Sequence, residues 1–354
     1  MKHNYGSVTF YITNVCNLNC EHCSYLNNYP VKGHQRWSDN KDSCIAWSKK
    51  IDPAVIMILG GEPMVNPDFL SWVTGLAEIW PNTEIRINTN GTCFDRWPDL
   101  YDICKSSQGQ INISISGHNE YTKTKEIDTI KNFLQGKVTI QKNDSKIFRK
   151  WIWNKIYNRI KDTTWPDVLS IDDYNNLPDH ILKEVNKVHH VYINNYIMND
   201  EPTKDYEVYV DENDVRVGWA RWDEFDTSAV KFDSTTQVLN LHDSNPEKAV
   251  SICHGGHCSY IKDGKWYKCQ VMGILPDMFK QNFPFNISPE DKELILSYQP
   301  ALPSWDFQQL ETFFEGLTQR KAIPQCKFCP EYKESNKIHA DTKKIKIIPL
   351  GRVV

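Results

Sequence analysis

Three cysteines with short, unequal spacing are the residues of this sequence best suited to chemistry. Cys16, Cys20 and Cys23 stand in the segment VCNLNCEHCSY, which follows the alternating run SVTFYIT. A disulfide would leave one thiol unpaired, and a structural zinc site takes four protein ligands, so a zinc loop would need a distant fourth ligand. Three thiolates can instead bind three irons of a 4Fe-4S cube and leave the fourth iron to a ligand that is not protein. The spacing therefore indicates a cluster site with one open position.

Five more cysteines could form a second metal site. Cys258 and Cys269 flank the segment SYIKDGKWYK, whose Asp-Gly pair predicts the turn of a β-hairpin. We therefore expect Cys258 to be a ligand together with Cys269, and Cys253 to be the alternative or a fifth, open-site or redox thiol. The remaining candidates are the CKFC pair, Cys326 and Cys329. Two separated cysteine pairs are also typical of a zinc ribbon, so this alternative stays open.

Composition and charge argue against several classes of protein. The 354 residues carry 41 basic and 45 acidic side chains, which gives a net charge of -4. The sequence therefore shows no excess of positive charge that would attract a polyanion such as nucleic acid. The start, MKHNYGSVTF, lacks the apolar region of a signal peptide, and no run of about 18 apolar residues occurs. We expect a cytoplasmic protein without a membrane partner. Its isolated cysteines are then expected to be small buried hydrophobic residues: Cys44, Cys93 and Cys104.

The elements that must position these cysteines follow a βα rhythm. The segment 66–80 has apolar residues at helical spacing, and strands alternating with helices imply a parallel sheet. We interpret one segment, 145–161, as a helix. Two later segments are interpreted as strands that finish the sheet: 189–199 and 206–222. The tail 343–354 is either a further strand or loose. Predicted strands of the sheet are 8–13, 55–60, 84–90, 111–117 and 137–141.

Polar and glycine residues gather where these strands end. The second strand is followed by GGEP, the third by the N-G pair of INTNGT, and the fourth ends in ISISG. Together with Cys-x3-Cys-x2-Cys directly after the first strand, these segments resemble the motifs of the radical S-adenosylmethionine (SAM) superfamily. The resemblance implies an α/β fold, a partial (β/α)6 TIM-like barrel. It also implies a 4Fe-4S cluster with SAM on its open iron, and cofactor-binding roles for His22, Gly60, Gly61, Glu62, Pro63, Asn90, Ser114 and Ser116. Ser116 stands where that family usually has aspartate.

The C-terminal cysteines resemble the Twitch and SPASM auxiliary-cluster domains, in which a hairpin and a later Cys-x2-Cys hold a second 4Fe-4S cluster. The resemblance implies a partial barrel over 1–240, a small cysteine-rich Twitch-like domain with a β-hairpin over 241–335, and a tail over 336–354. Five cysteines are too few for two auxiliary clusters, so Twitch is the better match.

The resemblance also implies an activity. SAM would be cleaved reductively to methionine and a 5'-deoxyadenosyl radical, which abstracts hydrogen from the substrate, with an external reductant such as flavodoxin or ferredoxin. An auxiliary cluster with four protein ligands would accept an electron, so we expect a net oxidation. Because the first cysteine loop already begins at residue 16, we expect no peptide-binding domain ahead of it, and we therefore expect a small molecule as substrate before a peptide. The alternatives are a peptide-modifying maturase and a non-catalytic zinc or iron-sulfur scaffold. No general base can be named from the sequence.

Overall fold

The structure is a computed structural model. The residues that it describes are 2–20, 23–117, 120–142, 206–221, 224–225, 228–253, 259–332, 336–337 and 340–341. The predicted helix at 145–161, the predicted strand at 189–199 and the tail at 343–354 lie outside the described residues.

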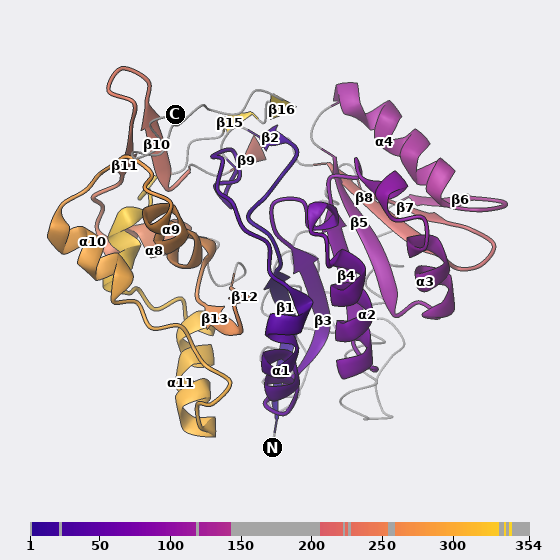
Figure 1. Cartoon of the computed structure of the whole chain (residues 1–354), viewed down its shortest axis with the longest axis horizontal. Coiled ribbons are helices and arrows are strands. Elements are labelled where there is room, and N and C mark those ends of the chain that lie inside the picture. The colour runs from indigo at the N-terminus through magenta and orange to yellow at the C-terminus, as the bar shows by residue number, and fades with distance from the viewer. Residues whose placement is uncertain are drawn as a thin grey trace, which may run out of the picture.

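A nine-stranded mixed sheet forms the centre of the described part of the chain (Figure 1). Its order is β13-β12-β1-β3-β4-β5-β8-β7-β6. Neighbours from β12 to β8 run parallel, whereas the pairs β12–β13, β8–β7 and β7–β6 are antiparallel. The bounds are β1 (His3–Tyr11), β3 (Ile51–Leu59), β4 (Glu84–Thr89), β5 (Ile111–Gly117), β6 (Thr139–Lys142), β7 (Tyr206–Val210), β8 (Arg216–Arg221), β12 (Tyr260–Lys262) and β13 (Lys265–Tyr267).

The first four predicted strands are confirmed as neighbouring parallel strands, and the predicted helix at 66–80 is confirmed as α2 (Phe69–Ile79). The segment 137–141 does not continue the parallel series. It forms the edge strand β6, antiparallel to β7, and the side chain of Ile140 on it is 48% exposed. Its alternation of polar and apolar residues suits an edge strand better than the centre of a parallel sheet, where strands are covered on both faces.

One face of the sheet carries the main hydrophobic core. Fully buried side chains such as Phe10, Ile58, Ile87 and Ile113 alternate along the strands and pack against helices. The helices are α1 (Trp37–Ser48), α2, α3 (Leu100–Ser106), α4 (Glu120–Phe133) and, from the C-terminal part, α11 (Phe307–Thr318). Cys44, Cys93 and Cys104 are buried in this core, as predicted. No helix among the described residues is long and apolar enough to cross a membrane.

The opposite face of the sheet is more polar. In register across β4 and β5, Arg86 lies beside Asn112, and Asn88 beside Ser114. On the next strand, β8, the neighbour of Ser114 is Gly218, and the neighbour of Ser116 is Ala220. The polar and small side chains of β4, β5 and β8 therefore share one face of the sheet, opposite the face that packs against the helices of the main core.

The C-terminal part has a second core, which also takes in the N-terminal loop residues Leu26, Tyr29 and Val31. The predicted hairpin is confirmed as β12 and β13, and it adds to the central sheet beside β1. The other elements here are β10 (Val230–Asp233), β11 (Val238–Leu241), β14 (Phe285–Asn286), α8 (Pro246–Ile252), α9 (Gln270–Lys280), α10 (Pro289–Leu296) and η4 (Pro324–Phe328).

Short elements complete the description. The 3-10 helices η1 (Pro63–Val65) and η2 (Phe94–Arg96) follow β3 and β4. β2 (Asn19–Cys20) pairs antiparallel with β16 (Ala340–Asp341), and β9 (Glu224–Phe225) pairs with β15 (Asn336–Lys337). The pairing of β16 brings the backbone near the C-terminus against the segment that carries Cys20.

Candidate functional site

The three N-terminal cysteines share one loop beyond the carboxyl end of β1. Cys20 is buried, whereas Cys16 and Cys23 are partly exposed. The loop is compact, because the amide of Leu18 donates to Cys16 Sγ at 3.4 Å and the amide of Cys23 donates to the Cys20 carbonyl at 3.3 Å. Burial, and then the neighbouring Cys23 and Cys16, raise the pKa of the Cys20 thiol to about 12. Three thiolates on one loop would repel one another, and cationic iron bound to them would relieve that repulsion.

The GGEP turn after β3 lies directly against this loop. The amide of Gly61 donates to the Thr13 carbonyl at 2.8 Å, and the amide of Glu62 donates to the Val15 carbonyl at 2.9 Å. A Cβ atom on Gly61 would come within 2.3 Å of the Val15 oxygen, and one on Gly60 within 2.6 Å of the Thr13 oxygen. These glycines are therefore required where the β3 turn meets the backbone of the cysteine loop.

The carboxylate of Glu62 ties the turn after β3 to the end of β4. Its side chain is fully buried. Oε1 accepts from the Met64 amide at 3.0 Å and from Thr89 Oγ1 at 2.7 Å, and Oε2 accepts from the Asn90 amide at 2.7 Å. Burial raises the pKa of Glu62, and the three hydrogen bonds oppose that rise. Pro63, also buried, starts the 3-10 helix η1.

Glu62→Gln is expected to lower the free energy of unfolding by about 1 to 3 kcal/mol, because the new amide NH2 would face a protein donor in a buried position. Urea denaturation of the iron-free protein measures this change. The exposed Glu78 on α2 supplies the control, and Glu78→Gln should leave stability nearly unchanged. Equal midpoints for the two variants would show that the buried carboxylate does not hold the strand ends together.

The loop after β4 also contacts the cysteine loop. Asn90 Nδ2 donates to Asn17 Oδ1 at 2.9 Å, and Asn17 Nδ2 donates to Thr92 Oγ1 at 2.7 Å. Asn90 Oδ1 in turn accepts from the amide and hydroxyl of Thr92, at 3.0 and 2.6 Å. Asn90 was predicted to bind the cofactor, and its side chain is part of the support of the loop that carries Cys16 and Cys20.

Ser114 and Ser116 lie on the polar face of β5, both partly buried, towards the carboxyl end of the strand. The carboxyl ends of β1, β3, β4 and β5 meet at one edge of the sheet because these strands are parallel. Gly218 and Ala220, the neighbours of the two serines on β8, carry no side chain larger than a methyl group. His22 lies outside the described residues.

The C-terminal cysteines meet in one pocket. Four thiols line it: Cys253, Cys269, Cys326 and Cys329. Burial, and then the neighbouring Cys253, raise the pKa of Cys269 to about 12, and burial with Cys269 raises that of Cys329. Cys258 lies outside the described residues, and Cys253, the alternative fourth thiol, is the one found on the pocket wall.

Neither the four thiols of this pocket nor the three thiols of the first loop, all of them in the described part of the chain, form a preformed site for one metal ion. Among the described residues, no three His, Cys, Asp or Glu side chains are arranged to hold a single metal ion. Lys268, Gln325 and Arg320 line the same pocket, so positive charge accompanies the sulfur atoms.

Several residues that support the cysteine loop were not predicted from the sequence. Three asparagine side chains in or beside the cysteine loop donate hydrogen bonds that stabilise it. Asn14 donates to the Lys32 carbonyl, Asn17 to the Thr92 hydroxyl and Asn27 to the Asn14 carbonyl. The signal available was the density of asparagine around the three cysteines, since this side chain often bonds to nearby backbone groups in loops. The pattern could not identify distant partners such as Thr92 for Asn17 and Asp277 for Asn14, because these lie 75 and 263 residues further along the chain.

These features define the class of the domain: an α/β sheet, parallel at its centre, that gathers a three-thiol loop and the loops after β3 and β4 at one edge. Comparison with family models identifies that class. Residues 10–142 match the model of the Radical SAM superfamily, so this part of the chain is a radical SAM domain. The match implies an enzyme that uses a 4Fe-4S cluster and S-adenosylmethionine. No curated protein matches the chain.

Proposed function

We propose that the chain is a radical SAM oxidoreductase that removes hydrogen from a small-molecule substrate and passes the released electron to a second cluster. The observation that carries the proposal is the edge of the sheet where the cysteine loop is hydrogen-bonded to the turn after β3 and to the loop after β4. Cys16, Cys20 and Cys23 would hold the first cluster. When bound, that cluster supplies the electron that splits SAM into methionine and a 5'-deoxyadenosyl radical.

The chain's own residues would position the cofactor beside the thiols. Glu62 is committed to three protein donors, so its part is to fix the turn after β3 and the start of the loop after β4. The hydroxyls of Ser114 and Ser116 would face the cofactor or substrate from β5. Gly218 and Ala220 would leave the space that a small substrate occupies beside them.

The second pocket would complete the oxidation. A substrate that has lost a hydrogen atom must still lose one electron and one proton to become a stable, two-electron-oxidised product. Cys253, Cys269, Cys326 and Cys329 would hold a second 4Fe-4S cluster. A cluster with four protein ligands has no site for substrate and exchanges only electrons.

Anaerobic reconstitution tests this function. The protein should turn brown, bind about eight irons, four for each cluster, and release 5'-deoxyadenosine from SAM with dithionite. A colourless zinc protein that releases no 5'-deoxyadenosine would identify a non-catalytic scaffold and end the proposal. Mass spectrometry of metabolites that remain bound during anaerobic isolation searches for the substrate, and a peptide found there would favour a maturase instead.

Lys268→Met is expected to lower the midpoint potential of the second cluster by roughly 50 to 100 mV, because two unit charges roughly 8 to 15 Å apart interact by about 1 to 2 kcal/mol at an effective dielectric constant of about 20. Lys268 is buried in the wall of the cysteine pocket, and its Nζ donates to the Lys321 carbonyl. Its positive charge would stabilise the reduced, more negative cluster and so favour electron acceptance. A redox titration followed by electron paramagnetic resonance (EPR) measures the potential. Lys265→Met, at an exposed site on β13, is the control, and equal potentials in both variants would exclude this tuning.

A further inference from the structure

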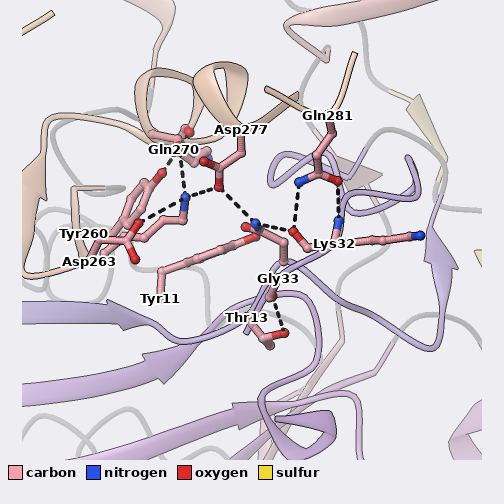
Figure 2. A network of polar contacts seen from close by, with 12 residues as sticks. Tyr11, Thr13, Lys32, Gly33, Tyr260, Asp263, Gln270, Asp277 and Gln281 are labelled. Carbon is pink, nitrogen blue, oxygen red and sulfur yellow. Dashed lines mark hydrogen bonds and ion pairs between the residues drawn. The ribbon is translucent and has the colours of Figure 1, made fainter. Parts of the chain in front are cut away.

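A polar network connects the C-terminal hairpin and α9 with the residues just before the first cysteine loop (Figure 2). Lys262, at the end of β12, has a side chain only 2% exposed. Its ammonium group pairs with the carboxylate of Asp277 on α9 and donates to the Gly273 carbonyl at 3.1 Å. A buried ammonium group without such a partner is strongly unfavourable, so the ion pair fixes α9 against the hairpin.

The same carboxylate reaches the N-terminal domain. Asn14 Nδ2 donates to Asp277 Oδ2 at 3.0 Å, and Asn27 Nδ2 donates to the Asn14 carbonyl at 2.7 Å. In the iron-free protein, the Cys23 thiol can donate a weak hydrogen bond to Asn27 Oδ1, at 3.9 Å. Two side chains therefore connect Asp277 with a cysteine of the first loop.

A second contact at the end of α9 holds the same loop. Gln281 accepts from the Lys32 amide at 2.9 Å and donates to the Lys32 carbonyl at 3.0 Å, and Figure 2 shows both bonds between these two residues. The loop from Asn14 to Lys32 is thus fastened to α9 at both of its ends.

The other end of α9 begins at the second cysteine pocket. Cys269 is the residue immediately before the helix, and it lines that pocket. From Cys269 to Asp277 the helix rises by about 12 Å, at about 1.5 Å per residue. One helix, with Pro276 inside it, therefore runs from a thiol of the second pocket to the support of the first loop.

We infer that Asp277 is a positioning residue, which sets the loop of Cys16, Cys20 and Cys23 at a fixed place relative to the second cysteine pocket. Apolar packing of α9 alone would allow small shifts of the helix, whereas the hydrogen bond to Asn14 selects one register. The role in electron transfer rests on the proposed function with two clusters. That Asp277 fixes the position of the loop does not depend on the proposed function, and this part can be tested in the iron-free protein.

Two double variants separate the hydrogen bond from the ion pair. K262M/D277N removes both charges and keeps an oxygen that can accept from Asn14. K262M/D277L removes both charges and that acceptor. Neither leaves an unpaired buried charge, so both should fold.

Hydrogen exchange of the iron-free proteins is the first measurement. Amides of residues 14–20 and 23–32 should exchange roughly two- to tenfold faster in K262M/D277L than in K262M/D277N, because one hydrogen bond contributes about 0.5 to 1.4 kcal/mol. Amides of β4 and β5 should exchange alike in both. Equal exchange of the loop in the two variants would overturn the inference.

EPR spectra of the reconstituted proteins are the second measurement. Addition of SAM should change the spectrum of the first cluster in K262M/D277N as it does in the unaltered protein. K262M/D277L should show a weaker change, and it should release more 5'-deoxyadenosine per product. Wild-type spectra in both variants would overturn the inference. An unaltered protein without iron-sulfur signals would instead end the proposed function and leave the exchange result standing.

Discussion

Replacing Cys16, Cys20 and Cys23 together by alanine is expected to abolish the release of 5'-deoxyadenosine from SAM and to lower the bound iron from about eight to about four per chain. The three thiols share one compact loop at the edge of the sheet where the turns after β3 and β4 converge. Without them no sulfur of this loop remains to hold a cluster. Iron analysis and chromatography of the reaction mixture with dithionite measure both quantities.

The substitution Cys326→Ala tests the second cysteine pocket separately from the first cysteine loop. This variant removes one thiol of the second pocket and leaves the first loop untouched, so some 5'-deoxyadenosine should still form while product per turnover falls. Cys104→Ala, at a buried position of α3 in the main core, controls for the general cost of losing a buried thiol. Release of 5'-deoxyadenosine by the triple variant would show that the first cluster is not held by these cysteines.

Local patterns were sufficient to predict the elements nearest the site. Phe10, Ile58, Ile87 and Ile113 belong to short apolar or alternating runs, and such runs separated by helices predict parallel strands. The Asp-Gly turn of the hairpin is a local signal too. Asp263 and Gly264 both adopt positive φ, 51° and 70°, as a two-residue turn of this type requires.

Pairings between distant segments could not be predicted in the same way. The hairpin joins β1, and Asn14 meets Asp277, 263 residues further along the chain. Nothing in the local sequence of either residue specifies the other, because the contact depends on how the whole chain packs. For the same reason the sequence could suggest Glu62 as a cofactor ligand but could not show that its carboxylate is already occupied by Thr89 and Asn90.

Gly61→Ala is expected to reduce the release of 5'-deoxyadenosine by about 100-fold or more, although no proposed ligand is changed. The added Cβ atom would lie 2.3 Å from the Val15 oxygen and 2.5 Å from its carbonyl carbon. Both are backbone atoms, so the turn after β3 and the cysteine loop must move apart. The hydrogen bonds from Gly61 to Thr13 and from Glu62 to Val15 join these two segments and would be lost or lengthened.

The matched substitution Gly316→Ala separates this effect from a general loss of stability. Gly316 lies in α11, and a Cβ atom there meets nothing within 4 Å, so alanine should be neutral or slightly stabilising. Gly61→Ala should keep the four irons of the second pocket while the iron of the first site falls and its EPR spectrum changes. Unchanged iron and unchanged release of 5'-deoxyadenosine in Gly61→Ala would mean that the cysteine loop tolerates a shift of the turn. The close approach of the two backbones would then be a feature of the fold and not a condition for the chemistry.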